Sequence, residues 1–310
     1  MRTQVGIVLL DAAAPFEPLL DVAGSARYAE QVGLDSLWAG DHLVLGDAPL
    51  LDSTLTLAAA AAVTRHIDIG SAVFLPALRP LIWAGRQVAT LSHLAAGRLQ
   101  LGVGAGAGPE QEYVAAGQRR NERGRRTDEF LQSLPALLAG RPIDVGDGDG
   151  DGDGDGAVAV RVLPPVPMPT VWIGGSSSVA LERTVRFGDG WLGAFLTPAE
   201  FAVTSARLRE LAAAAGRPMP RLGLVTHATI GRVDDRSLQE SGVTLLRSAY
   251  GLPTERAEQL VLAGSPTQVA DRLAEYVAIG AEQLVVINDQ GPWQQACDLL
   301  ADTRNRLTGL

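Results

Sequence analysis

Lysine is absent from this sequence of 310 residues, and all 26 basic residues are arginine. Its absence excludes a Schiff-base lysine and the lysine of a phosphate-binding P-loop. Acidic residues outnumber the basic ones and leave a net charge of −9. Because nucleic-acid binding needs a basic excess to neutralise phosphates, we expect no nucleic-acid partner.

Cysteine occurs once, as Cys297, so an intrachain disulfide is excluded and a reducing compartment is expected. The N-terminal segment lacks the basic region, apolar stretch and cleavage site of a signal peptide. No apolar run approaches the roughly 20 residues that a membrane span needs. These absences predict a cytoplasmic protein that does not contact a membrane.

Residue types that carry catalysis by themselves are also sparse. The four histidines, at positions 42, 66, 93 and 227, show no spacing typical of metal ligands, so we predict no metal site. No Gly-x-Ser-x-Gly nucleophile elbow occurs. A shortage of catalytic side chains is typical of an enzyme whose cofactor supplies the chemistry.

Short apolar runs alternate along the chain with longer segments of helical periodicity. The runs predict eight strands, at residues 5–10, 36–39, 67–74, 99–103, 171–173, 191–195, 222–230 and 284–287. The helical segments are residues 18–32, 53–64, 81–94, 127–138, 179–187, 198–215, 255–262, 266–279 and 293–307. Such alternation implies a parallel sheet, and eight units in about 300 residues favour a closed (β/α)8 TIM barrel of the α/β class. We therefore expect residues 1–310 to form a single domain.

A Gly-Asp repeat at residues 146–156 interrupts this pattern. Glycine and like charge cannot bury enough apolar surface to fold, so the repeat predicts a flexible surface loop. A calcium-binding loop is the alternative. The strict two-residue repeat disfavours it, because the spacing and terminal Glu of an EF-hand loop are missing.

Active sites of (β/α)8 barrels lie at the carboxyl ends of the strands, and Asp41 and His42 follow the strand at 36–39. Histidine has a pKa suited to acid–base work. We favour a functional role for this pair over a structural pair that caps the next loop. The glycines at 104, 106 and 108 end the strand at 99–103, where they would allow close backbone approach to a ring or ribityl chain.

The strand at 171–173 ends in Gly174, Gly175, Ser176, Ser177 and Ser178, and a helix follows at once. Backbone N–H groups, hydroxyls and a helix N-terminus together form a phosphate cradle. An ordinary serine N-cap is the alternative. Two glycines and three serines exceed the needs of a cap, so we favour anion binding.

The same segments resemble the luciferase-like monooxygenase superfamily, specifically its coenzyme F420-dependent oxidoreductase branch. The resemblance covers most of the chain and is strongest between Arg65 and Gly106, where the spacing is long and specific. Its other parts are residues 29–38 with Asp41 and His42, Glu112-Tyr113 with 124–129, 169–175 with 188–191, and 264–266 with Val269, Gly280 and Ala281.

The resemblance implies a role for each candidate residue. His42, with Asp41, would lie near the reactive part of the deazaflavin ring, and Glu110 or Glu112 would supply a carboxylate near the substrate. Ala72-Val73 matches the place where relatives carry a non-proline cis peptide that supports the ring. The remaining cofactor contacts would be Gly104, Ala105 and Gly106 along the tail, and Gly174, Gly175, Ser176 and Ser177 at the phosphate.

The chain also departs from its relatives. Ala107 stands where many of them carry a bulky residue, and the large insertions of the luciferase and alkane-monooxygenase branches are absent. We therefore predict an F420-dependent oxidoreductase that transfers hydride between the deazaflavin C5 and a small organic substrate. The alternatives are an FMN-dependent monooxygenase that uses reduced flavin and O2, and a non-catalytic flavin-binding protein.

Three further expectations concern the surroundings of the cofactor and the assembly. The oligoglutamate tail of F420 would favour an arginine-rich groove beyond the phosphate, with Arg79 and Arg183 as candidate contributors. His227 and Arg247 are candidates to face the pocket, and a surface position is the alternative. Relatives are often dimers, so a homodimer is a candidate assembly.

Overall fold

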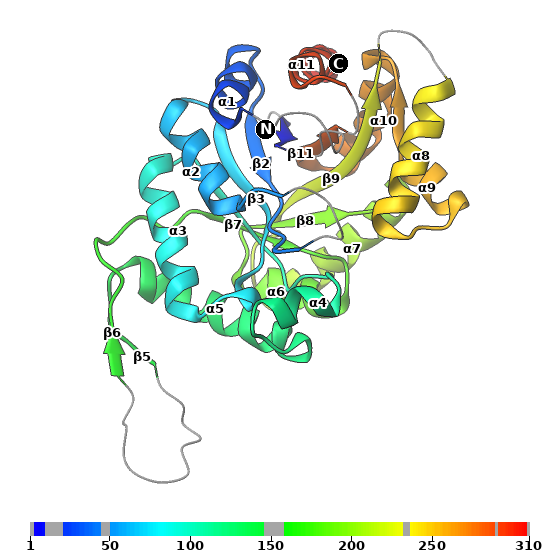
Figure 1. The fold of residues 1–310 in the computed structure, drawn as a ribbon. Coiled ribbons are helices and arrows are strands. Elements are labelled where there is room, and N and C mark those ends of the chain that lie inside the picture. Colours follow the sequence, from blue (N-terminus) through cyan, green and yellow to red (C-terminus); the bar gives the residue numbers. More distant parts are fainter. Residues whose placement is uncertain are drawn as a thin grey trace.

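The computed structural model describes residues 3–9, 21–44, 50–145, 158–231, 236–288 and 291–308. Eight strands form a closed parallel barrel surrounded by helices (Figure 1), which confirms the predicted fold class. The barrel strands are β1 (Gln4–Val8), β2 (Ser36–Ala39), β3 (Asp68–Phe74), β4 (Leu99–Val103), β7 (Thr170–Gly174), β8 (Gly190–Ala194), β9 (Arg221–Ile230) and β11 (Ala281–Asn288). β1 pairs with β11 and β8 pairs with β9, and these pairings close the barrel.

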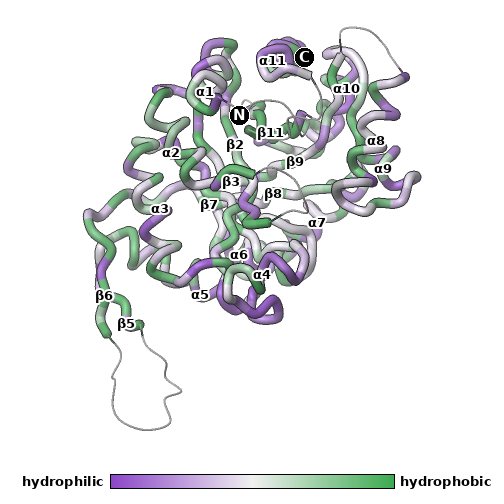
Figure 2. Tube along the Cα trace, viewed as in Figure 1, coloured by the Kyte–Doolittle hydropathy of each residue, from purple (hydrophilic) through white to green (hydrophobic). Residues whose placement is uncertain are grey.

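The helices alternate with these strands as the periodicity predicts. The main ones are α1 (Val22–Gln31), α2 (Ser53–Val63), α3 (Leu81–Ala95), α5 (Arg123–Leu138), α6 (Ser178–Phe187), α7 (Pro198–Ala214), α9 (Thr254–Leu260), α10 (Pro266–Ile279) and α11 (Trp293–Thr308). Capping boxes begin α7, with Thr197 and Glu200, and α10, with Ser265 and Gln268. Hydrophobic residues follow the barrel strands, and hydrophilic residues gather on the outer helices and between α4 and α5 (Figure 2).

Two tryptophans fill the lower interior of the barrel. Trp38 and Trp172 are fully buried, and facing glycines make room for their rings. A Cβ atom on Gly70 would lie 2.3 Å from Trp38 Cε3, and one on Gly190 would lie 2.3 Å from Trp172 Cε3. Gly70 of β3 therefore serves core packing.

The indole N–H groups have partners inside the barrel. Trp38 Nε1 donates to Ser36 Oγ at 2.8 Å, and Trp172 Nε1 donates to Gln100 Oε1 at 2.9 Å. Gln100 Nε2 donates to Asp68, and burial raises the pKa of that carboxyl above its usual range. This network fills the amino-terminal part of the barrel interior.

Several elements lie outside the predicted pattern. They are the strands β5 (Ile143–Val145), β6 (Val158–Val160) and β10 (Leu262–Gly264), the helices α4 (Glu110–Ala115) and α8 (Arg236–Tyr250), and the 3-10 turns η1 (Pro76–Leu78) and η2 (Arg120–Glu122). β5 and β6 pair as an antiparallel ribbon that projects from the barrel (Figure 1). The Gly-Asp repeat at 146–156, for which we predict flexibility, lies outside the described residues.

Among the predicted helices, α5 starts earlier than expected and without a side-chain cap, whereas α2 starts at Ser53 as expected. α5 begins at Arg123, four residues before the predicted start, and α2 is capped by Asp52, whose carboxylate accepts the Leu55 N–H at 2.9 Å. In the described parts of the chain, no helix combines the length and apolar character required to cross a bilayer.

Candidate active site at the carboxyl end of the barrel

The structure brings together two of the four predicted catalytic residues. His42 follows β2 and Glu112 lies in α4, and His42 Nδ1 is 3.1 Å from Glu112 Oε1. Oε1 also accepts the Leu43 backbone N–H at 2.9 Å, and the Glu112 side chain is fully buried. The His42 side chain is 34% exposed. An Nδ1–H that donates to this carboxylate leaves Nε2 as a proton acceptor.

Gly108 accounts for the position of the buried carboxylate. A Cβ atom at residue 108 would lie only 1.9 Å from Glu112 Oε2. That oxygen has no hydrogen-bond partner among the described residues. Glycine at 108 therefore allows Glu112 to reach His42, and any side chain there would push the carboxylate away.

Asp41 is engaged by the protein itself. Its carboxylate accepts from Arg79 Nη1 and Nη2 at 2.6 and 2.7 Å, from Leu75 N at 2.7 Å and from Ser53 Oγ at 2.7 Å. The side chain is only 3% exposed. This arrangement ties the end of β2 to the segment after β3, so the geometry points to a positioning role for Asp41 beside His42.

Glu110 lies apart from this pair. It is exposed in the first turn of α4, and it lines a cavity together with three arginines. Of the two carboxylates that the sequence leaves open as the acid near the substrate, only Glu112 contacts His42.

Val73 forms a contact surface between three strand ends. The Ala72–Val73 peptide is cis, and the register of β3 against β4 shifts between Ser71 and Phe74. The Val73 side chain packs closely against two glycines. A Cβ atom on Gly104 would lie 2.5 Å from Val73 Cγ2, and one on Gly174 would lie 2.9 Å from Val73 Cγ1. The candidates Ala72, Val73, Gly104 and Gly174 therefore lie together on one side of the mouth.

Tyr113 packs beside the next part of the glycine run after β4, and it is not among the site residues predicted from the sequence. The ring is fully buried, and its hydroxyl donates to the Ala105 carbonyl at 2.9 Å. Gly106 has φ +79°, and a Cβ atom there would lie 2.5 Å from that hydroxyl. Burial raises the pKa of Tyr113, so the hydroxyl stays a neutral donor near pH 7. Its place in the Glu112-Tyr113 block was the only sequence signal for it.

The predicted phosphate turn joins β7 to α6 and is open to solvent. Gly175 has φ +107°, and residues 175–179 are exposed. Ser177 Oγ accepts the Ala180 N–H at 3.3 Å, so Ser177 is an N-cap as the alternative interpretation has it. The first amides of α6 precede the first intrahelical bond and point along the positive end of the helix dipole. Both interpretations of the serines are thus compatible with this turn.

The part of the mouth at the ends of β8 and β9 is aromatic. His227 is buried, and its Nε2 lies 3.1 Å from the Tyr250 hydroxyl. Phe195 stacks on the His227 ring with centroids 5.9 Å apart and meets the Tyr250 ring edge-on at 4.8 Å. Phe195 and Tyr250 are 36% and 40% exposed. His227 is therefore in the barrel rather than on the surface, and the sequence reasoning missed Phe195 and Tyr250.

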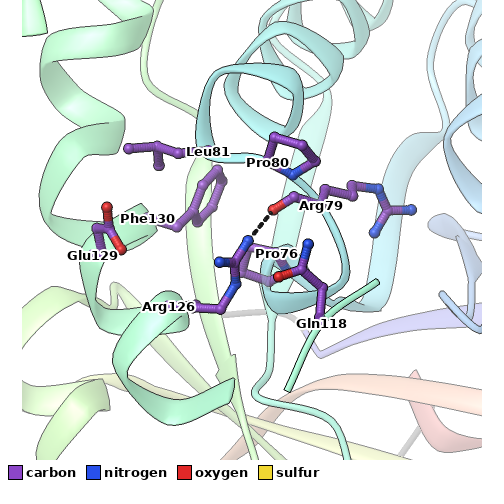
Figure 3. Close-up of a pocket in the computed structure, with 8 residues that line it drawn as sticks. All are labelled: Pro76, Arg79, Pro80, Leu81, Gln118, Arg126, Glu129 and Phe130. Atoms are coloured by element: carbon purple, nitrogen blue, oxygen red, sulfur yellow. Dashed lines mark hydrogen bonds between the residues drawn. The ribbon is translucent and has the colours of Figure 1, made fainter. Parts of the chain in front are cut away.

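Arg79 and Arg183 are not available to an anionic tail, contrary to the expectation from the sequence. Arg79 binds Asp41, and Arg183 is buried and pairs with Asp128 at 2.7 Å. A cavity of about 280 Å³ borders the Arg79 backbone (Figure 3). Arg126 donates there to the Arg79 carbonyl at 2.8 Å, and the Arg79 guanidinium points away.

Within the described residues, no three His, Cys, Asp or Glu side chains gather in an arrangement that could hold a metal ion. Cys297 is buried, and burial raises the pKa of its thiol to about 12, so it is unsuited to act as a thiolate nucleophile. At the mouth of the barrel, the structure shows one imidazole–carboxylate contact among the described residues named above, that of His42 with Glu112.

A barrel with its polar residues at the carboxyl ends of the strands defines a TIM-barrel enzyme architecture. The family model described as luciferase-like monooxygenase matches residues 3–246, and the chain belongs to that family. An F420-dependent glucose-6-phosphate dehydrogenase from Beutenbergia cavernae is 30% identical over 88% of each chain.

Two solved structures show how widely the fold is shared. An F420-dependent secondary alcohol dehydrogenase, solved in complex with an F420-acetone adduct, superposes with a TM-score of 0.81 over 99% of each chain, at 18% identity. The oxygenating constituent of a Pseudomonas putida 3,6-diketocamphane monooxygenase, in complex with FMN, has a TM-score of 0.77 over 100% of this chain and 98% of that one, at 16% identity. Named members of the fold thus include both F420- and FMN-dependent oxidoreductases.

Proposed function

We propose that the chain is an F420-dependent oxidoreductase that acts on a small, uncharged organic substrate. The observation that carries the proposal is the His42–Glu112 pair, which lies at the carboxyl end of the barrel beside the glycine-rich wall of Val73, Gly104 and Gly174. The 30% identity to a relative named F420-dependent supports the choice of cofactor.

The residues present fit a flat ring with a phosphate-bearing tail. Val73 and the small residues around it offer an apolar face without projecting side chains, which suits a planar ring. The exposed turn with Gly175, Ser176 and Ser177 would hold the phosphate through backbone N–H groups at the start of α6. Gly104, Ala105 and Gly106 would line the tail between these two places. When bound, a deazaflavin accepts or donates hydride at its C5.

The protein's own residues then have distinct tasks. Glu112 Oε1 holds the Nδ1–H of His42, which orients the imidazole and leaves Nε2 to take a proton from a substrate hydroxyl or return it to a carbonyl. Asp41 binds Arg79 and the Leu75 N–H, which keeps the end of β2 against the segment after β3. We assign Asp41 as a positioning residue, and Glu110 has no part in this step.

The aromatic group of Phe195, His227 and Tyr250 would contact the substrate. It lies at the ends of β8 and β9, and it offers ring faces and a hydroxyl. These features favour an uncharged, partly apolar substrate over a sugar phosphate.

Fluorescence titration with F420 and with FMN, side by side, tests the proposal. We expect micromolar or tighter binding of F420 and at least tenfold weaker binding of FMN, since tenfold corresponds to about 1.4 kcal/mol. Binding of FMN alone would overturn the choice of cofactor and favour the monooxygenase alternative. Full turnover by His42→Ala would contradict the assignment of His42, whereas loss of turnover with intact cofactor binding would exclude a pure binding protein.

A further inference from the structure

A second cavity, of about 470 Å³, lies against α4, η2 and the first residue of α5. We call it the arginine pocket, because Arg119, Arg120 and Arg123 line it with only one carboxylate, that of Glu110. Its remaining lining residues are Val114, Gln118 and Asn121. In a protein with a net charge of −9, this is a local concentration of positive charge.

The charges of the two central arginines are not neutralised by the chain. Arg120 Nε donates to the Gly108 carbonyl at 3.1 Å, and Arg123 Nη1 donates to the Arg120 carbonyl at 3.0 Å. Neither forms an ion pair within the described part of the chain. Arg119 has only a 3.8 Å contact with Glu122 and is 82% exposed. By contrast, Arg79 and Arg183 are each bound to a carboxylate.

The pocket is continuous with the loop proposed to line the cofactor tail. Arg120 donates a hydrogen bond to the carbonyl of Gly108, the last glycine of the run after β4. α5 and α6 both begin at the carboxyl end of the barrel, and Arg183 Nη2 of α6 donates to the Gly124 carbonyl at 3.4 Å. Arg183 is five residues from the start of α6, a distance of roughly 7.5 Å along the helix. The phosphate turn and the arginine pocket therefore lie at adjacent helix starts on the same rim.

We propose that the arginine pocket binds the carboxylates of an anionic chain that extends from the cofactor's phosphate. This inference rests on the proposed function, because the lactyl-oligoglutamate tail of F420 carries such carboxylates and FMN ends at its phosphate. Guanidinium groups match carboxylates in geometry and charge, and unpaired arginines are free to form these bonds. The pocket thus contributes to the choice between the two cofactors.

The test compares F420-0, which has the phospholactyl group but no glutamate, with F420 that carries several glutamates. We expect the wild-type protein to bind the polyglutamylated form roughly tenfold more tightly, as expected for a few partly exposed ion pairs. The double variant Arg119→Gln/Arg123→Gln keeps the Arg120–Gly108 bond. It should reduce the ratio of the two dissociation constants to about one without changing the affinity for F420-0.

The matched control is Arg209→Gln/Arg217→Gln, which removes two exposed arginines, one within α7 and one three residues after its end. It should leave the tenfold ratio intact, and 0.5 M salt should abolish that ratio in the wild type because exposed ion pairs are screened. If the two dissociation constants are equal in the wild type, or if their tenfold ratio persists in Arg119→Gln/Arg123→Gln, the pocket assignment is overturned. In either case, binding of F420-0 would still uphold the proposed function. Binding of FMN but of neither deazaflavin overturns the proposed function itself.

Discussion

Glu112 connects His42, at the end of β2, with Gly108 in the glycine run after β4. It is fully buried, it contacts both His42 and the Leu43 N–H, and its second oxygen rests on Gly108. A buried carboxylate in contact with an imidazole orients the ring and stabilises the protonated form that arises during acid–base work. The chemistry of His42 should therefore depend on Glu112 and not on Glu110.

We expect Glu112→Gln to lower kcat about tenfold to a hundredfold, as for loss of general acid–base assistance. The cofactor Kd should stay within about twofold of wild type, because the proposed cofactor contacts are elsewhere. Glu110→Gln, an exposed substitution in the same helical turn, is the matched control and should keep wild-type kcat. Steady-state kinetics with cofactor titration checks the pair, and equal losses in both variants would refute the assignment.

Glu30 illustrates a residue of the family block with a structural task. Its Oε1 accepts the backbone N–H groups of Arg65, His66 and Ile67 at 2.7–3.0 Å. Burial by itself raises the pKa of this carboxyl, but the three donors outweigh it and hold the pKa below the ordinary value of 4.5. The carboxylate thereby stabilises the turn that leads into β3.

Glu30→Gln should lower the free energy of unfolding at pH 7 by about 1–2 kcal/mol, since it weakens bonds to a charged acceptor. Because the folded-state pKa is lowered, this stabilisation is present above the unfolded pKa and is lost as the pH falls through the folded one. The wild type and the variant should therefore converge below pH 4.5. Urea unfolding over a pH series checks this, with the exposed Glu210→Gln as control, and a pH-independent gap would contradict it.

Among the elements, β2 and β3 show how packing assigns the glycines. Trp38 of β2 lies over Gly70 of β3, where a Cβ atom would come within 2.3 Å of the ring. Gly40, two residues after Trp38, would place a Cβ atom 3.8 Å from its nearest neighbour, the Ala72 carbonyl. Both positions are glycine, but only at Gly40 is there room for a Cβ atom.

We expect Gly70→Ala to destabilise the fold by about 1–3 kcal/mol, the usual cost of overpacking a rigid core. Gly40→Ala has ordinary contact distances and should be neutral or slightly stabilising. Thermal or urea unfolding of the two variants checks the prediction. A Gly70→Ala protein as stable as Gly40→Ala would mean that the Trp38 ring can shift.

The segment from α4 to the start of α5 is the element that sequence reasoning described least well. It contributes Glu112, Tyr113 and the arginine pocket, yet its first helix has only six residues, too few for a clear helical period. Composition alone shows its arginines without showing which of them are paired. α8, which has 15 residues, was also missed, and with it Tyr250 at the mouth.

In the molecule as a whole, alternation of apolar runs and helical periods predicted all eight barrel strands and the helices between them other than α4 and α8. Parallel strands need crossover connections, so eight such units leave little choice of topology. The ribbon of β5 and β6 and the short β10 were not predicted, because three-residue strands carry no usable periodicity. Family membership follows from the long blocks, but many of their residues, such as Glu30, hold the barrel together rather than perform chemistry.

The amino-acid sequence alone was sufficient to predict the barrel, the end of it at which a site is expected, and several of the residues at that end. Tertiary structure decided which of these residues act together: His42 contacts Glu112, 70 positions away, while its neighbour Asp41 turns to Arg79, 38 positions away. Local patterns encode periods of two and 3.6 residues, whereas such pairings depend on strand register and on how loops fold back over the barrel mouth. Only the tertiary structure could therefore show that His42 pairs with Glu112 and that Asp41 pairs with Arg79.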